Sequence, residues 1–206
     1  MSKKILPVYI LIRTSGRPVF FKRMMESIRK QTYENIITIV HTDSPDDKYV
    51  EGDIILSSEM DKSAGRAYYN LYCNKLLDNI PSGKGWYHFL DDDDEYFDEN
   101  TIENLVEKSK KRYVNVARVD RGNGFVWPKY WKNQESFSGE CVFIRTKYKS
   151  MARWRAKRKS DHYYTKQLTE ILPINWIDNL IISRAQIGKG RGKRLDAGDT
   201  EVLNGK

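Results

Sequence analysis

Four consecutive aspartates, Asp91–Asp94, are the residues whose type and spacing most clearly indicate chemistry. They directly follow the apolar segment 86–90, WYHFL, which is predicted to be a buried strand. Two carboxylates about 4 Å apart repel each other by up to about 4 kcal/mol at an effective dielectric of 20, and a divalent cation removes this cost. Because alternate residues of an extended chain point to the same side, Asp91 and Asp93 can converge on one ion.

An all-oxygen site with few protein ligands favours Mn²⁺ or Mg²⁺, with a substrate phosphate completing the coordination shell. The alternative interpretation is an acidic turn that caps the following helix, through Asp94 or Asp98. The position of the cluster after a buried strand favours the metal site.

The segments that must position this cluster alternate between strands and helices. Apolar, β-branched runs predict strands, and apolar residues at helical spacing predict helices. The predicted strands are 7–12, 36–41, 53–56 and 86–90, and the predicted helices between them are 19–31 and 63–77. This alternation is typical of an α/β fold with a mainly parallel sheet. Ligands of such sheets bind beyond the carboxyl ends of the strands, where the aspartates are expected.

The second half of the chain is less regular. Helices are predicted at 101–109 and 161–172 and strands at 113–119 and 140–146, with an irregular aromatic segment at 122–137. After Arg184 the composition becomes rich in glycine and basic residues, which predicts a flexible basic tail over 186–206. No segment is long enough to act as a linker, so we expect a single domain over 1–206.

Composition excludes several classes of protein. Of 206 residues, 39% are hydrophobic and 31% charged, too apolar for a disordered chain and too polar for a membrane protein. There is no apolar run of about 20 residues, and the first 18 residues resemble a strand more than a signal peptide. Two distant cysteines, Cys73 and Cys141, suit reduced thiols in a cytoplasmic protein. The net charge of +8 favours an anionic partner.

Four stretches together resemble the inverting glycosyltransferases of the GT-A fold, family 2 type. They are the opening strand–helix–strand segment 7–43, the SAGRAYYN segment 63–70, the FLDDDD segment 89–94, and the SFSGECVFIRT segment 136–146 followed by KSDHYY. The third matches the family's D-x-D metal motif. The resemblance runs over about residues 7–170 and implies a GT-A fold, a mostly parallel mixed sheet flanked by helices. A chain this small is also similar to glycosyltransferase domains of large DNA viruses and phages, which would act in the host cytoplasm.

The resemblance implies roles for the aspartate cluster. Asp91 and Asp93 would hold Mn²⁺ or Mg²⁺ against the diphosphate of a nucleotide-sugar donor, which we expect to be UDP-linked, and Asp91 and Asp92 would lie at the nucleotide. Residues 1–98 would then bind the nucleotide sugar, and residues 99–185 would form the acceptor side. The acceptor would be a glycan or another hydroxyl compound.

Further donor contacts are implied at Arg13 and Thr14, at Asp43, and at Arg66. For Asp43, an Asx turn with the two residues that follow it explains the residue equally well. For Arg66, a solvent-exposed charge on a helix is the alternative.

The resemblance also implies that Asp161 is the general base that deprotonates the acceptor hydroxyl, which then displaces the diphosphate with inversion. The family shows Glu-Asp at this place, whereas this chain has Ser160-Asp161. An N-cap for the helix beginning at His162 is the alternative role for Asp161, and His162 is itself a second candidate base.

Two other functions compete with sugar transfer. A nucleotidyltransferase-like enzyme would need a phosphate-binding glycine loop that RTSGRP, residues 13–18, does not match. A nucleic-acid-binding module is suggested by segment 145–159, which has eight Lys/Arg in fifteen positions, but it leaves the aspartates unexplained, and we expect no nucleic-acid partner. The same basic residues predict peripheral contact with an anionic membrane. Aromatic residues of the second half, among them Trp127, Tyr130, Trp131 and Trp154, suggest an acceptor groove.

Overall fold

A mixed sheet forms the centre of the computed structural model, which describes residues 5–59, 62–65, 67–121, 126–128 and 137–185. In these ranges nine strands pair in the order β3-β2-β1-β4-β8-β6-β9-β5, and β7 lies beside β6. The strands are β1 Val8–Thr14, β2 Ile36–Thr42, β3 Ile54–Ser57, β4 Trp86–Phe89, β5 Asp94–Tyr96, β6 Val114–Asp120, β7 Val126–Trp127, β8 Val142–Arg145 and β9 Ile174–Ala185. Strands β3, β2, β1 and β4 are parallel, and β8 runs antiparallel between β4 and β6.

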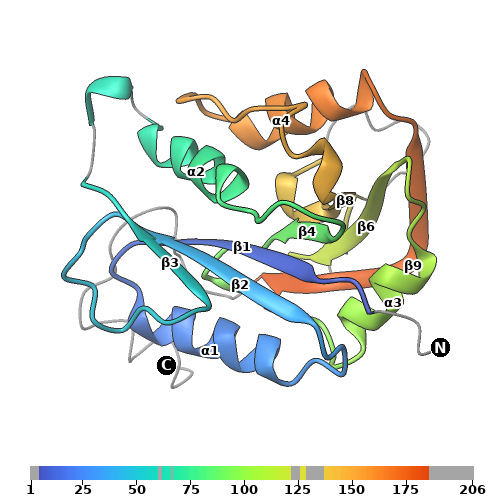
Figure 1. The fold of residues 1–206 in the computed structure, drawn as a ribbon, viewed down its shortest axis with the longest axis horizontal. Coiled ribbons are helices and arrows are strands. Elements are labelled where there is room, and N and C mark those ends of the chain that lie inside the picture. The colour runs from blue at the N-terminus through green and yellow to red at the C-terminus, as the bar shows by residue number, and fades with distance from the viewer. Residues whose placement is uncertain (1–4, 60–61, 66, 122–125, 129–136, 186–206) are drawn as a thin grey trace.

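Four α-helices cover the two faces of this sheet. They are α1 Pro18–Arg29, α2 Tyr72–Asp78, α3 Thr101–Lys108 and α4 Ser160–Thr169. Figure 1 shows α1 and α3 below the sheet and α2 and α4 above it. Helix α1 starts at a proline, whose fixed φ suits the first turn, and buries an apolar stripe of five residues, Phe20, Phe21, Met24, Met25 and Ile28.

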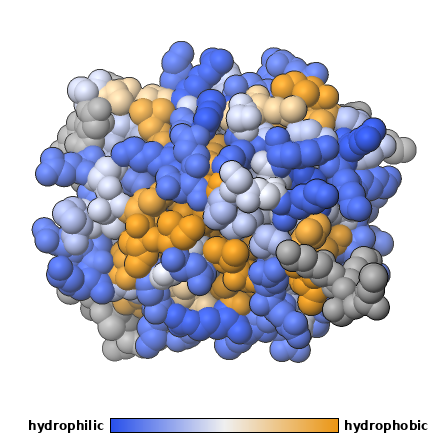
Figure 2. All heavy atoms as spheres, viewed as in Figure 1, coloured by the Kyte–Doolittle hydropathy of each residue, from blue (hydrophilic) through white to orange (hydrophobic). Residues whose placement is uncertain are grey.

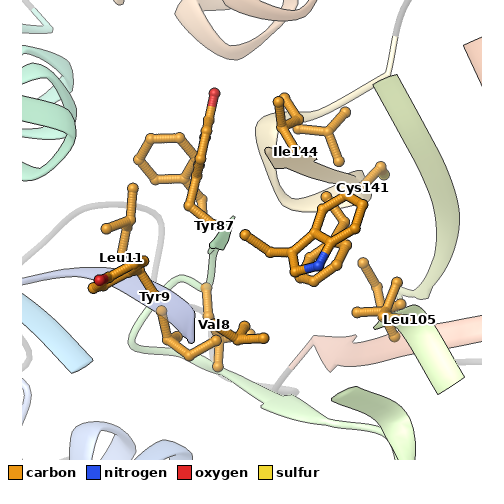
Figure 3. Close-up of a cluster of buried hydrophobic side chains, with 14 of the residues drawn as sticks. Val8, Tyr9, Leu11, Tyr87, Leu105, Cys141 and Ile144 are labelled. Atoms are coloured by element: carbon orange, nitrogen blue, oxygen red, sulfur yellow. The ribbon is translucent and has the colours of Figure 1, made fainter. Parts of the chain in front are cut away.

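The core joins both halves of the chain. Strands β1, β4 and β8 are buried along nearly their whole length, as expected for strands covered on both faces. Figure 3 shows Leu11 from β1, Tyr87 from β4 and Ile144 from β8 in one apolar cluster with Leu105 from α3. Both cysteines are free and buried, as the sequence predicts. No helix in the described ranges combines the length and apolar character needed to cross a membrane.

The structure differs from the sequence predictions in several elements. The predicted helix 63–77 is broken into 3₁₀ turns at Lys62–Ala64 and Tyr68–Leu71, and α2 begins only at Tyr72. Gly65 lies between the two turns with φ of +118°, which a continuing helix cannot accommodate. The predicted strand 140–146 begins instead with a 3₁₀ turn.

Strands β5, β7 and β9 were not predicted. β9 pairs with β6 in parallel, but the pairing shifts register between Val116 and Val119, so no clean alternation of apolar residues marks the strand. β5 is only three residues long and begins at Asp94, inside the acidic cluster. Asp94 therefore starts a strand that pairs with β9 and does not cap a helix.

Helix α4 is tied to the sheet by one buried polar contact. The Tyr164 hydroxyl lies 2.8 Å from the Tyr87 hydroxyl on β4, and both side chains are almost fully buried. Since each hydroxyl partners the other, this pair fixes the position of α4 above β4.

We expect Tyr164→Phe to lower the free energy of unfolding by about 1–3 kcal/mol, because the Tyr87 hydroxyl loses its partner in a buried site. The double variant Tyr87→Phe/Tyr164→Phe should lose less than the sum of the two single variants, since no unpaired hydroxyl remains. Urea unfolding of the three variants measures this coupling. Strictly additive losses would show that the two hydroxyls do not interact.

Candidate active site

The site lies where β1 and β4 end side by side. Leu11 pairs with Phe89 in parallel register, so the residues two positions further along each strand, Arg13 and Asp91, come level with each other. Arg13 Nε donates a hydrogen bond of 3.2 Å to Asp91 Oδ1. The aspartate cluster therefore emerges at the carboxyl edge of the parallel strands, as predicted.

A cavity of about 220 Å³ opens at this edge. It brings together residues far apart in the sequence: Arg13 and Asp91 from the sheet, Arg121 after β6, Glu140 before β8, and Asp161 at the start of α4. The remaining lining residues are Leu11, Tyr69, Asn70, Cys73, Phe89, Ser138, Gly139, Trp154, Lys159 and Ser160. Two of the predicted donor and metal residues and the predicted base thus share one cavity.

Three of the four aspartates can meet at one ion. Carboxylate oxygens of Asp91, Asp93 and Asp94 all lie within 4.8 Å of one another. This includes the predicted pair Asp91 and Asp93 and adds Asp94. Three carboxylates suit a hard divalent cation such as Mn²⁺ or Mg²⁺, so the residues present fit the metal that the sequence predicts.

Asp92 points away from this group. Its side chain is fully buried and accepts hydrogen bonds from Thr14 Oγ1 at 2.7 Å and from Arg17 Nε at 3.0 Å, with a second contact from Arg17 Nη2. Burial raises the pKa of Asp92, while the Arg17 guanidinium favours its charged form. Asp92 therefore ties the aspartate turn to the end of β1 and does not line the cavity, which favours a structural role over the predicted donor contact.

The pKa values of the acidic side chains around the cavity are shifted in opposite directions. Burial opposes ionisation of Asp91, but the Arg13 guanidinium outweighs it and lowers the pKa of this carboxyl. Asp94 and Glu140 hydrogen-bond to each other, and burial together with their mutual repulsion raises the pKa of Asp94 well above its usual range. Arg121 Nη1 lies 3.3 Å from Glu140 and partly balances its charge.

Arg13 is held in a fixed position at the cavity wall. Besides Asp91, its guanidinium donates to Asn70 Oδ1 at 2.7 Å and lies over the rings of Tyr69 and Trp154, at 5.4 and 5.7 Å. Asn70 in turn donates to the carbonyl of Lys157 at 2.9 Å. This chain of contacts links β1 to the basic segment that precedes α4.

The start of α4 carries the predicted base. The helix begins at Ser160, so Asp161 lies in its first turn and not at the N-cap that the alternative interpretation assigned to it. Lys159, at the N-cap position, has φ of +58° and is the one non-glycine residue with positive φ among those described. A strained residue beside a predicted catalytic group is typical of functional sites.

Other predicted residues lie near the cavity but do not line it. Thr14 is buried against Asp92 and Tyr49. Asp43 is 8% exposed and accepts a hydrogen bond of 2.8 Å from Ser15, so its carboxylate faces the β1–α1 loop. Arg66, Tyr130, Trp131 and the tail at 186–206 lie outside the described residues.

Sequence reasoning missed Arg121 and Glu140 as cavity residues. Arg121 follows directly after β6, which runs in the same direction as β4, so the rule that located Asp91 applies to it too. Glu140 precedes β8, which is antiparallel, so the beginning of that strand reaches the same edge. The location of Glu140 could be predicted only once the order and direction of the strands were known.

Comparisons with known proteins agree with this architecture. No family model matches the chain, and no curated protein matches it. Among solved structures, S. aureus TarS 1–349 superposes with a TM-score of 0.65 at 16% identity, covering 88% of this chain and 60% of the other. The same protein in complex with UDP-GlcNAc gives 0.65 at 14%, covering 90% and 60%. The mannosyltransferase PcManGT from Pyrobaculum calidifontis, in complex with GDP-Man and Mn²⁺, gives 0.61 at 14%, covering 90% and 58%.

These neighbours are GT-A glycosyltransferases. The chain has the GT-A fold. The predicted fold class is therefore confirmed, and the chain is similar in structure to GT-A glycosyltransferases, as the sequence resemblance predicts. The chain spans about 60% of the length of TarS 1–349 and PcManGT, so this GT-A chain corresponds to part of each.

We expect the conformation of Lys159 to cost stability. A non-glycine residue in the left-handed region costs about 1–3 kcal/mol, against about 0.5–1 kcal/mol for the extra entropy of glycine in the unfolded chain. The free energy of unfolding of Lys159→Gly should therefore be about 1 kcal/mol higher than that of Lys159→Ala. The alanine variant removes the same amine but keeps the backbone strain. Denaturant unfolding of the pair measures this; an alanine variant as stable as the glycine variant contradicts the strain.

Proposed function

We propose that this GT-A chain is a metal-dependent glycosyltransferase that transfers a sugar from a nucleotide-diphosphate donor, UDP-linked, to an acceptor hydroxyl with inversion. One observation carries the proposal: the cavity at the carboxyl edge of the sheet is lined both by Asp91, a member of the three-carboxylate group, and by Asp161. The TarS structures with UDP and UDP-GlcNAc and the PcManGT structure with GDP-Man and Mn²⁺ support a nucleotide-sugar donor.

Asp91, Asp93 and Asp94 would hold the divalent cation. When bound, this ion would offset the negative charge that develops on the departing diphosphate. The carboxylates of the chain supply the oxygen ligands, and Arg13 keeps Asp91 ionised and oriented.

Three cationic side chains would bind the diphosphate. Arg13, Arg121 and Lys159 all line the cavity. Arg13 is fixed by Asn70 and two aromatic rings, and so requires little ordering when an anion arrives. Lys159 precedes Asp161 by two residues and lines the same cavity, where the diphosphate and the acceptor must come close together. Arg121 already balances Glu140 and would add positive charge at the same cavity.

Asp161 would act as the general base. As the acceptor oxygen attacks the anomeric carbon, the proton of its hydroxyl passes to the Asp161 carboxylate while the bond to the diphosphate breaks on the opposite face. This single displacement inverts the configuration and requires no covalent bond to the protein. His162, the second candidate base, does not line the cavity.

The nucleoside and the acceptor would occupy opposite sides of this centre. The nucleoside would bind near Asp43 and Thr14, which lie at the ends of β2 and β1. Asp43 would hydrogen-bond the base or the ribose. On the other side, Tyr69 lines the cavity and is 40% exposed, so its ring would contact an acceptor sugar. Trp154 is only 6% exposed and stacks on Tyr164, so it would support this wall without stacking on the sugar.

We expect UDP binding to depend on Mn²⁺ in the wild-type protein and this dependence to disappear in Asp93→Asn, since the variant removes one carboxylate of the three-residue group. Calorimetric titration of UDP with and without Mn²⁺ measures both. Asp178→Asn removes an exposed carboxylate elsewhere and should behave as the wild type. Mn²⁺-dependent UDP affinity retained in Asp93→Asn would refute the metal assignment.

We expect Asp161→Asn to slow donor turnover by about 10²–10⁴-fold, because the amide cannot accept the acceptor proton. The affinity for UDP should change by less than about twofold, since the general base has no role in binding the leaving group. Release of UDP from nucleotide sugars, with water or added acceptors, measures turnover, and titration measures binding. Turnover within about threefold of the wild type would remove Asp161 as the base.

A further inference from the structure

The residues that flank the carboxylate group include one arginine that the proposed function does not use. Arg17 lies in the loop between β1 and α1, directly before the helix, and it does not line the cavity. Its guanidinium nevertheless contacts two of the four aspartates. An arginine that contacts a candidate metal ligand and does not line the cavity calls for an explanation other than direct donor binding.

Arg17 is locked in place by a buried partner. Its Nε and Nη2 atoms form a two-pronged contact with Asp92, which is fully buried and also accepts from Thr14. The backbone N–H of Arg17 donates to Tyr49 at 3.2 Å, and its side chain is only 12% exposed. The guanidinium therefore cannot move away from the aspartate turn without leaving Asp92 with a buried, uncompensated charge.

The third nitrogen of the Arg17 guanidinium, Nη1, faces the three candidate metal ligands. Arg17 Nη1 donates to Asp93 Oδ2 at 2.8 Å, just as Arg13 Nε donates to Asp91 Oδ1 at 3.2 Å. Two of the three candidate ligands thus each have one oxygen bonded to a permanently protonated guanidinium. A divalent cation that binds these carboxylates enters against two positive charges a few ångströms away, in a site partly shielded from solvent.

We propose that the positive charge of Arg17 keeps the divalent cation from binding by itself and so couples metal binding to binding of the donor diphosphate. The diphosphate brings negative charge that attracts the cation and offsets the arginines, so each ligand strengthens the binding of the other. This inference rests on the proposed function. Arg13 is unsuited to testing it, because Arg13 lines the cavity and would contact the diphosphate directly.

A simple orienting role for Arg17 makes the opposite prediction. If the hydrogen bond to Asp93 only aimed that carboxylate at the metal, removing it would weaken metal binding by about 10- to 100-fold, as loss of an outer-shell partner usually does. If the charge of Arg17 opposes the cation, removing it strengthens binding of the metal alone. The direction of the change in Mn²⁺ affinity therefore separates the two roles.

The test is titration of Mn²⁺, followed by the electron paramagnetic resonance signal of the free ion, with and without UDP. Arg17→Gln should bind Mn²⁺ alone about tenfold more tightly than the wild type, and UDP should increase its Mn²⁺ affinity by a correspondingly smaller factor. Arg17→Lys keeps the charge without the two-pronged geometry and should stay within about threefold of the wild type.

Arg23→Gln is the matched control. Arg23 makes a similar two-pronged contact from α1 to Glu95, with both distances 3.1 Å, but Glu95 is not among the three metal candidates. The Mn²⁺ affinity of Arg23→Gln should equal that of the wild type. An equal gain in Arg23→Gln would show that net charge of the protein, and not the position of Arg17, governs metal affinity, which overturns the proposal.

A second comparison keeps the test valid if Arg17→Gln alone does not fold. Asp92→Asn removes the buried carboxylate first, and Arg17→Gln/Asp92→Asn is then compared with Asp92→Asn alone, with the same tenfold gain expected. Weaker or unchanged Mn²⁺ binding on loss of Arg17 overturns the inference. Absence of any UDP binding by the wild type, with or without Mn²⁺, would instead refute the proposed function.

Discussion

The balance of charge at the carboxyl edge of the sheet is the constraint on which the rest of this structure depends. Four consecutive aspartates follow β4, and burial penalises each of them as an anion. Two arginines form ion pairs with these aspartates: Arg13 at the end of β1 and Arg17 before α1. The β1–α1 loop is therefore shaped as much by the aspartates as by its own sequence.

The same charges explain how the site can bind an anion and a cation together. Asp91, Asp93 and Asp94 offer oxygens to a metal, while Arg13, Arg121 and Lys159 offer positive charge to a diphosphate, and Asp91 lines the same cavity as these three cations. Neither set is neutral alone, and each is partly paired with the other. A site arranged in this way favours a ligand that carries both charges, such as a nucleotide diphosphate with its metal.

Contacts between distant segments give this site its rigidity. Asn70 joins Arg13 to the carbonyl of Lys157, and the Tyr87–Tyr164 pair fixes α4 over β4. Asp161 is thereby held above the cavity by a helix and not by a loop. Such placement on regular elements limits the motion of a catalytic group and keeps it within reach of the reacting atoms.

The sequence alone determined the parallel strands of the first half of the fold and the centre of the site. Buried strands have continuous apolar runs, and the D-x-D aspartates follow one of them, so their position at the sheet edge is a local consequence. The tertiary structure decided what surrounds them: β9 with its register shift, the broken helix before α2, the inward turn of Asp92, and the arrival of Arg121 and Glu140. These features depend on pairing between segments far apart in the chain, and no periodicity within one segment records such pairing.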